Sequence, residues 1–485
     1  MQKVWSISGR SIAVSALALA LTACQSMRGP EPVAQANIPE QGYLTASSGP
    51  SIAEQGYKDF FADQRLLQVL DLALANNRDL RTSTLNIQRA QQQYQITQNN
   101  QLPTIGASGS VLRQDTLNTG AMTSYNVGLG VTAYELDFWG RVRSLKDNAL
   151  DTYLATSSAR DATQIALVGQ VAQAWLNYSF ANANLRLADQ TLKAQLESYN
   201  LNKKRFDVGI DSELPVRQAQ ISVETARNDV ANYKTQIAQA QNLLNLLVGQ
   251  AVPANLLPTQ RVTRISKSNA FSAGLPSDLL NNRPDVRAAE YKLSAAGANI
   301  AAAKARLFPT ISLTGNAGYA STSLSDLFKS GGFVWSIGPS IDLPIFDWGT
   351  RKANIKISET DQQIALSDYE KSIQSAFREV NDALAVRQNI GDRLAAQRRL
   401  VDATNTTYRL SNARFRAGID SYLTVLDAQR ASYAAEQGLL LLEQANMNNQ
   451  VEVYKTLGVG IKANTSDAVL QPASTAEQKA ANSAQ

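Results

Sequence analysis

The sequence predicts a mainly α-helical chain with a small β part, built from two structurally equivalent halves. The stretch Arg205–Leu214, RFDVGIDSEL, returns as Arg414–Leu423, RFRAGIDSYL. Long proline-free segments with apolar residues at 3-4 spacing predict long helices, and two alternating segments predict strands. The repeated unit of roughly 200 residues is far longer than a solenoid repeat. We therefore expect function to lie in what both halves share.

The duplication extends along most of the chain. Three further motifs recur in the same order, and they are Leu102–Ile105 with Phe308–Ile311, Trp139–Gly140 with Trp348–Gly349, and Asn76–Arg81 with Asn282–Arg287.

Composition excludes several classes of function. The chain has 485 residues, a net charge of +5 from 46 basic and 41 acidic side chains, and no histidine. The absence of histidine excludes Ser-His-Asp triads, zincin motifs and histidine-ligated metals. The small, unclustered basic excess predicts no nucleic-acid partner. No phosphate-binding or dinucleotide motif is present, and no nucleophile, base and orienting group occur together, so we expect neither an enzyme nor a metal site.

The N-terminus predicts export and lipidation. A basic start and the apolar stretch Ser11–Ala23 are typical of a secretory signal peptide, and the stretch is too short to span a bilayer as a helix. Leu21–Cys24 resembles the bacterial lipobox, which implies that Cys24, the only cysteine, carries a covalent lipid. Gln25 in place of an inner-membrane-retaining Asp points to the outer membrane. The alternative is an incidental cysteine near an ordinary cleavage site. No other cofactor is expected.

Helical periodicity dominates the body of the chain. Between Arg141 and Gly209, and again between Arg351 and Gly418, no proline interrupts a run that could form one helix of roughly 60 residues. Such helices could form a fibrous coiled coil, or they could line an elongated structure. The clearest seam follows a 3-4 spacing typical of coiled coils: Val216, Ala219, Val223, Ala226, Val230, Tyr233, Ile237, Ala240, Leu244 and Leu247.

Two segments break this pattern at matching places. After Pro103 and again after Pro309, apolar and polar residues alternate, which predicts two strands of roughly ten residues in each half. Tilted transmembrane strands have this length. A soluble hairpin with one buried face fits the alternation equally well, and the lipidated start favours the membrane. Aromatic residues at the segment ends are typical of a membrane-interface girdle: Tyr134, Phe138, Trp139, Phe308, Phe346 and Trp348.

Four strands in lipid require an assembly. An open edge leaves unpaired N–H and C=O groups, so only closed barrels satisfy strands in a bilayer, and the smallest have about eight strands. Two chains would give eight strands with a filled interior, whereas three would give twelve with a lumen. A transport function therefore favours a homotrimer. Each hairpin crosses the bilayer and returns to the side from which it started. The helices therefore lie on the same side as Cys24, which is the periplasmic side.

These motifs resemble those of a known family. Glu135–Arg141, Leu343–Gly349, Asn281–Arg287 and the two RF…GIDS stretches make the chain similar to TolC-like outer-membrane factors of tripartite multidrug efflux pumps, nearest the OprM-type lipoprotein branch. The resemblance implies a homotrimer with a shared twelve-stranded barrel in outer-membrane lipid and a periplasmic tunnel of α-helices. It also implies a periplasmic adaptor and an inner-membrane transporter of the resistance-nodulation-division class as partners.

The duplicated RF…GIDS stretches predict two helix-turn-helix tips. Gly209 and Gly418 can take a positive φ to end the incoming helix, and Pro215 suits the first turn of the outgoing one. The pairs Asp211/Ser212 and Asp420/Ser421 are expected to cap the outgoing helices. The residues could simply form turns. By analogy with the family, the adaptor-contact candidates are Arg205, Gly209, Ser212, Leu214, Arg414, Gly418, Ser421 and Leu423.

The second tip also carries a candidate gate. Leu423 and Asp427 lie four residues apart and so share one helical face. An Asp near a helix N-terminus usually serves only the helix dipole. The resemblance implies instead that these two residues form inward rings that constrict the closed tunnel. Two positions depart from the family: Phe415 stands where a Tyr is common, and Pro215 replaces an acid found in some members.

The sequence leaves three classes of function to compare. An exit duct for drugs is favoured, an outer-membrane duct of a type I protein secretion system is the alternative, and a non-channel structural lipoprotein is a third. The predicted segments are a lipoprotein signal peptide (1–23), a lipid-anchored tether (24–64), first-half helices (65–102), a first transmembrane β-hairpin (103–139), long coiled-coil helices with a tip near 209 (140–250), a linker and helix (251–308), a second β-hairpin (309–348), long helices with a tip near 418 (349–460) and a disordered tail (461–485).

Overall fold

The computed structural model describes residues 27, 29, 32–35, 56–116, 120–258, 260–267 and 283–458. The predicted signal peptide, Cys24, most of the tether and the tail lie outside the described residues, as do the first two residues of the Asn281–Arg287 motif. The chain divides into two compact units. The first contains 85–157 and 288–371 with the described residues before 36, and the second contains the remaining described residues.

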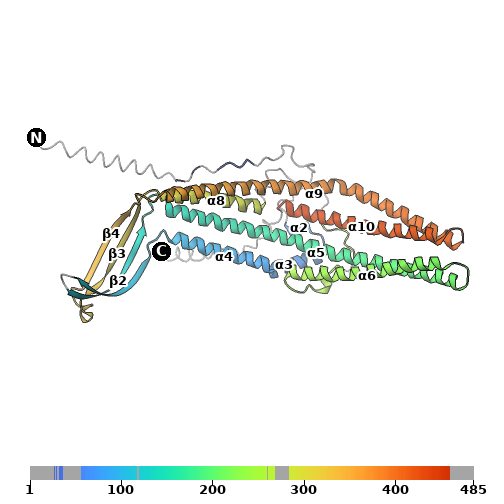
Figure 1. Ribbon diagram of the computed structural model, residues 1–485, viewed down its shortest axis with the longest axis horizontal. Coiled ribbons are helices and arrows are strands. Elements are labelled where there is room, and N and C mark those ends of the chain that lie inside the picture. The colour runs from blue at the N-terminus through green and yellow to red at the C-terminus, as the bar shows by residue number, and fades with distance from the viewer. Residues whose placement is uncertain are drawn as a thin grey trace. The chain divides into compact units, whose positions relative to one another are not determined.

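The described chain is mostly helical with one four-stranded sheet, as predicted (Figure 1). Among the described helices, none combines the length and apolar character needed to cross a lipid bilayer. The principal elements in order are α2 (Tyr57–Phe60), α3 (Gln64–Asn76), α4 (Arg78–Asn99), β1 (Ile105–Thr116), β2 (Gly120–Glu135), α5 (Arg141–Asp207), α6 (Glu213–Val248), η2 (Ala254–Leu256), α8 (Pro284–Ala305), β3 (Thr310–Ser321), η3 (Leu324–Asp326), β4 (Phe333–Asp342), α9 (Thr350–Arg416) and α10 (Tyr422–Thr456).

The first unit contains the sheet, which is antiparallel with the order β1-β2-β3-β4. At its centre Gly128 of β2 faces Gly318 of β3, where an added Cβ at Gly128 would lie 2.8 Å from the Ala317 carbonyl oxygen. The pairing shifts between Val131 and Tyr134, and Ala133 there has a φ of 48°, which is typical of a β-bulge. β2 has 16 residues and is longer than predicted.

The sheet is open within the described chain. β1 and β4 each have a neighbour on one side only, and every residue of β4 is exposed. Large apolar side chains are among them, for example Trp335 (69% exposed) and Ile341 (70% exposed). A soluble hairpin that buries one face does not show this pattern, because one set of alternate residues would be covered.

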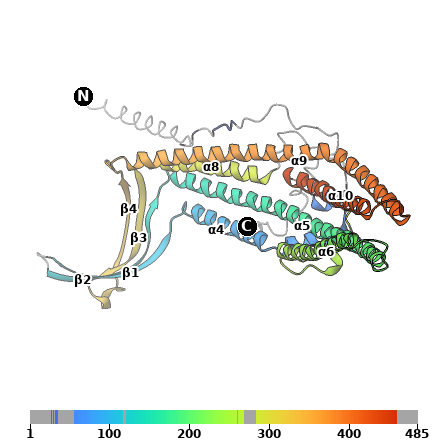
Figure 2. The same cartoon turned by 45° about the vertical axis from the view of Figure 1, so that its right-hand side comes forward.

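The second unit is built from helical hairpins. α5 with α6, and α9 with α10, run antiparallel and lie side by side in both views (Figures 1 and 2). α5 and α9 are each 67 residues long, slightly longer than predicted. The seam predicted on α6 is confirmed where it meets its neighbours: Val216, Ala219, Val223, Ala226 and Val230 are buried.

The core of the second unit is aromatic and aliphatic. Trp175 of α5 is fully buried, and its indole N–H donates to the Leu256 carbonyl oxygen at 3.1 Å. Phe60 packs against Tyr454 with ring centroids 4.8 Å apart. Burying each such side chain stabilises the fold by about 1.5–3 kcal/mol. This core lies where the N-terminal helices meet the long hairpins, and so it anchors the hairpins that carry the candidate site.

Candidate functional site at the helical tips

The first tip joins α5 to α6 through a tight left-handed turn. Gly209 has a φ of 73°, its N–H donates to the Phe206 carbonyl at 2.9 Å, and the Ile210 N–H donates to the Arg205 carbonyl at 2.9 Å. This pair of hydrogen bonds is a Schellman motif, which satisfies the last carbonyls of the incoming helix. The positive φ predicted for Gly209 is confirmed.

The second tip repeats this geometry between α9 and α10. Gly418 has a φ of 75°, its N–H donates to the Phe415 carbonyl at 2.9 Å, and the Ile419 N–H donates to the Arg414 carbonyl at 3.0 Å. An added Cβ at Gly418 would meet no atom within 4 Å. Glycine is therefore required here by its backbone conformation and not by lack of space.

Alanine at the second tip is expected to destabilise the protein. Gly418→Ala places a Cβ in the left-handed region at a cost of about 1–2 kcal/mol. Gly391→Ala is the matched control, since Gly391 lies in the middle of α9 with open space around it, and alanine there should stabilise the helix by up to about 1 kcal/mol. Urea unfolding in detergent, followed by circular dichroism, measures both. Equal midpoints for the two variants would contradict the prediction.

The predicted capping of the outgoing helices is wrong in its detail. Ser212 and Ser421 do occupy the N-cap positions with extended backbone, at φ −81° and −74°. Within the described chain, however, neither hydroxyl accepts a hydrogen bond from the helix it precedes. Asp211 and Asp420 do not cap either, because their carboxylates turn back to arginines at the end of the incoming helix. Pro215 lies in the first turn of α6, as predicted.

An Arg–Asp pair spans each turn, and the two pairs differ in strength. The Arg414 guanidinium binds Asp420 through two hydrogen bonds, Nε to Oδ2 at 2.6 Å and Nη2 to Oδ1 at 3.0 Å. Arg205 reaches Asp211 through one long contact of 3.4 Å. The hydrogen bond from Arg414 lowers the pKa of Asp420. The Arg414 side chain is exposed and the Asp420 side chain is half-buried at the surface, so this pair orients the turn more than it stabilises the fold.

The two tips are joined by an aromatic cluster. Phe415 of α9 is buried and packs on Tyr422 of α10 with ring centroids 5.6 Å apart. Ala219 of α6 belongs to the same cluster, and the Arg205 guanidinium lies over the Phe415 ring at 5.3 Å. A cation over an aromatic face is stabilised by about 0.5–2 kcal/mol. The Phe that departs from the family pattern therefore links the first hairpin to the second through Arg205.

A cleft of about 440 Å³ opens beside this cluster. Glu197 and Leu201 of α5 line it together with Tyr408 and Arg416 of α9 and Tyr422 of α10. Burial raises the pKa of Tyr422 to about 12, so its hydroxyl stays protonated at neutral pH. Sequence reasoning missed this cleft. Tyr408 and Tyr422 fall at seam-like spacings, where an aromatic residue normally indicates core packing.

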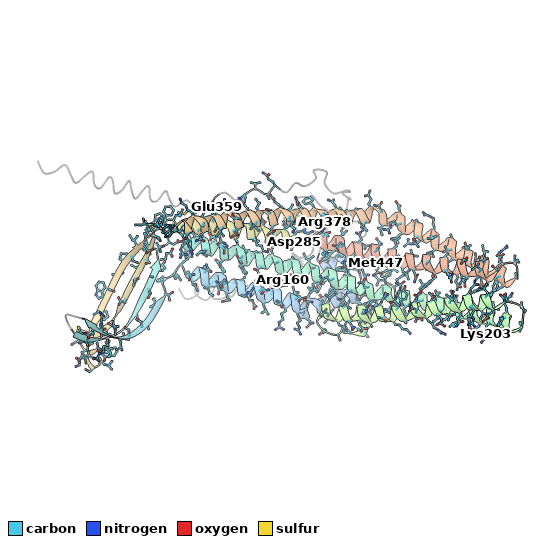
Figure 3. All side chains as sticks on the ribbon, in the orientation of Figure 1. Arg160, Lys203, Asp285, Glu359, Arg378 and Met447 are labelled. Atoms are coloured by element: carbon cyan, nitrogen blue, oxygen red, sulfur yellow. The ribbon has the colours of Figure 1, made fainter. Side chains whose placement is uncertain are left out.

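The contact and gate candidates lie mainly outside the cluster. On α10, Tyr422 and Val425 are buried, whereas Leu423 (48% exposed) and Asp427 point away from the chain's own core. In Figure 3 the label of Lys203 shows where α5 ends at the first tip. Of the candidates, only Arg205 is half-buried, and the remaining ones are exposed: Gly209, Ser212, Leu214, Arg414, Gly418, Ser421 and Leu423.

This arrangement is suited to docking. The described residues contain no group of three acidic or cysteine side chains close enough to hold a metal ion. The site consists of two exposed turns. Apolar and polar side chains lie on the turns and on the first residues of the helices that follow them. Together with an open sheet, this site defines a class of protein that acts by assembly.

Comparison with known proteins identifies the family. The family model described as outer membrane efflux protein matches residues 69–250 and again 275–459, and so covers both halves. A probable efflux pump outer membrane protein, TtgC of Pseudomonas putida, is 44% identical over 423 residues, which are 86% of this chain and 87% of TtgC. The cation efflux system protein CusC of Escherichia coli is 38% identical over 452 residues, 92% of this chain and 98% of CusC.

A solved structure agrees with these relatives. The open-state outer membrane channel MtrE of Neisseria gonorrhoeae superposes with a TM-score of 0.83 at 38% identity, covering 90% of this chain and 98% of MtrE. The chain belongs to the outer membrane efflux protein family. It is an outer-membrane efflux channel, which confirms the family resemblance and the efflux function predicted from the sequence and favours them over a secretion duct.

Proposed function

We propose that this chain is the exit duct of a tripartite multidrug efflux pump of the resistance-nodulation-division class and works as a homotrimer. The observation that supports the trimer is the open sheet, whose edges β1 and β4 lack partners within the described chain. Unpaired strand edges are not tolerated in lipid. Three copies supply twelve strands, enough for a barrel with a lumen, whereas two supply eight and fill the interior.

The periplasmic adaptor docks at the tips. Each trimer presents six turns, two per chain, with the same Schellman geometry. Leu214 on the first outgoing helix and Leu423 on the second are 64% and 48% exposed, next to the polar residues Ser212 and Ser421. Exposed apolar side chains beside rigid turns provide the anchor that a helical partner needs. The inner-membrane transporter supplies the energy, and this chain forms a passive, gated path.

A lipid on Cys24 holds the N-terminus to the outer membrane. The lipobox-like Leu21–Cys24 sequence supports this proposal. One acyl modification binds reversibly, so a multiply acylated cysteine provides the stable anchor. Cells labelled with radioactive palmitate should yield a labelled protein, and Cys24→Ser should abolish the label. Equal labelling of both proteins would place the lipid elsewhere.

The cargo is tested by deletion and complementation. We expect a strain that lacks the chain to become at least several-fold more susceptible to structurally unrelated drugs, and the intact gene to restore resistance. Protein secretion should be unchanged. Because CusC is a cation efflux protein at 38% identity, susceptibility to metal cations is the second measurement. Loss of toxin secretion with normal drug resistance would favour the secretion duct, and sensitivity to cations alone would replace drugs by metals as cargo.

A further inference from the structure

The tryptophan at the end of the first hairpin is held by its own chain. Trp139 follows β2 and stacks on Phe308, with ring centroids 4.8 Å apart and planes 20° from parallel. Its indole N–H donates to the Pro309 carbonyl oxygen at 2.8 Å. Phe308 and Pro309 immediately precede β3, the strand that pairs with β2. The contact therefore seals the β2–β3 junction where the strands meet the helices.

The equivalent tryptophan has no such support. Trp348 follows β4, is 89% exposed and forms a T-shaped ring contact with Phe346, with ring centroids 4.6 Å apart. Its indole N–H has no acceptor among the described residues. Trp348 also has a φ of 55°, which is an outlier for a bulky side chain and costs on the order of 1–3 kcal/mol. The backbone after Trp348 is held by the Asp347 carboxylate, which accepts from the Gly349 N–H and the Arg351 N–H at 3.1 Å each. The turn is therefore supported within the chain, but the indole ring is not.

The missing partner exists elsewhere in the same sequence. The repeat pairs Phe308–Pro309 with Leu102–Pro103, which is separated by one residue from the start of β1 at Ile105. Leu102 is 65% exposed and Pro103 is exposed too. β1 and β4 are opposite edges of one sheet, so Trp348 cannot reach Leu102 across the two intervening strands. The contact between Trp139 and Phe308–Pro309 is therefore made within the chain. The equivalent partners, Trp348 and Leu102–Pro103, do not meet within the chain, and both are exposed.

A second contact shows the same relation. The Leu136 N–H donates to the Ile311 carbonyl at 2.8 Å, next to the Trp139 clasp. The repeat maps these two residues onto Ile345 and Ile105. Ile345 is 93% exposed and Ile105 is 71% exposed. At the positions that the repeat aligns with these two contacts, both the backbone hydrogen bond and the aromatic contact are absent among the described residues, and their would-be partners lie at the two opposite edges of the sheet.

We propose that Trp348 of one copy packs on Leu102 of the next copy and donates its indole N–H to that copy's Pro103 carbonyl. The Ile345 N–H then donates to the Ile105 carbonyl of the same neighbour, and β4 pairs antiparallel with its β1 as β2 pairs with β3. The inference rests on the proposed function, because it needs copies arranged around a closed sheet. It adds the residues that set the register between them. A Trp348 that only touches lipid headgroups is the competing explanation.

Paired cysteines test the contact in the full-length protein. Trp348→Cys/Leu102→Cys is treated in membranes with a short crosslinker that joins two thiols, then run on a denaturing gel. Trp139→Cys/Phe308→Cys is the matched control, because the same contact there lies within one chain. Trp348→Cys/Gln114→Cys is the register control, since Gln114 lies near the far end of β1. The unsubstituted chain measures any reaction of Cys24.

The expected result is a ladder of two and three linked chains for the 348/102 pair. The 139/308 pair should lose its free thiols without a change in the number of chains per band, and the 348/114 pair should not link. Native mass spectrometry of the same samples reports the trimer independently. Trimers that link at 139/308 but not at 348/102 would overturn the clasp and leave the exit-duct proposal standing. Absence of any trimer would overturn both.

Discussion

Replacing Leu423 and Asp427 together by alanine is expected to raise the single-channel conductance several-fold in a planar lipid bilayer. Both side chains are exposed on one face of α10, just beyond the second tip, while Tyr422 and Val425 on the opposite face are buried. Three-fold repetition would turn each exposed side chain into a ring. A ring of leucines excludes water from a constriction, and a ring of carboxylates attracts cations. Truncating both should widen the path and weaken its preference for cations.

The first hairpin offers a matched control for this experiment. Leu214 and Gln218 occupy the equivalent positions on α6, where Leu214 is 64% exposed. Leu214→Ala/Gln218→Ala removes an apolar side chain at the equivalent position of the first hairpin but removes no charged side chain. Its effect on conductance should therefore be small. Asp427→Asn alone should lower cation selectivity more than conductance. Conductance of the double variant equal to that of the unsubstituted channel would show that Leu423 and Asp427 do not form the gate.

Replacing Arg283 by methionine is expected to lower the free energy of unfolding by about 2–4 kcal/mol. The Arg283 side chain is 8% exposed and bridges Asp285 at 2.6 Å and Glu379 at 2.8 Å. It also donates to the Thr456 carbonyl at 3.0 Å. Breaking a fully buried ion pair costs about 3–5 kcal/mol. The expected cost is lower here because the side chains of Asp285 and Glu379 are 45% and 33% exposed.

The same network makes stability depend on pH. Burial acts to raise the pKa of Asp285, but the hydrogen bond and charge of Arg283 outweigh it and leave that pKa below its ordinary value. A carboxylate with a lowered pKa stabilises the fold at neutral pH. That contribution is lost as the pH falls below the ordinary Asp value and through the pKa of the folded state. Arg283→Met should remove this part of the acid sensitivity.

Thermal unfolding in detergent at neutral and acidic pH measures both effects. Arg217→Met is the control, because Arg217 pairs with Glu213 at 2.7 Å on the surface with both side chains more than half exposed. Such a pair contributes at most about 1 kcal/mol. A loss of stability in Arg283→Met no larger than in Arg217→Met would show that the buried network does not support the fold.

Much of the architecture follows from patterns between near neighbours in the sequence. The 3-4 spacing on α6 correctly predicted buried residues such as Val223 and Val230, because a helix brings those positions to one face. Gly209 and Gly418 correctly predicted left-handed turns, because few residues other than glycine take that conformation at low cost. The alternating segments correctly predicted four strands.

Partners distant in the sequence were harder to predict. Asp211 and Asp420 were expected to act at helix caps, and instead each pairs with an arginine across its turn. The repeat in the sequence makes Trp139 and Trp348 equal, yet one is clasped by Phe308 and the other is exposed. Nothing in the local pattern around Phe415 indicates that Arg205 lies over its ring.

The amino-acid sequence alone thus determined the local conformation and periodicity, namely two repeated halves, long helices, four strands and two glycine turns. The order of the strands, the pairing of charges and the difference between the two tryptophans arose only on folding. The physical reason is that backbone preference depends on a few adjacent residues. Which side chain satisfies a carboxylate or an indole N–H depends instead on which distant segments packing brings within hydrogen-bond reach.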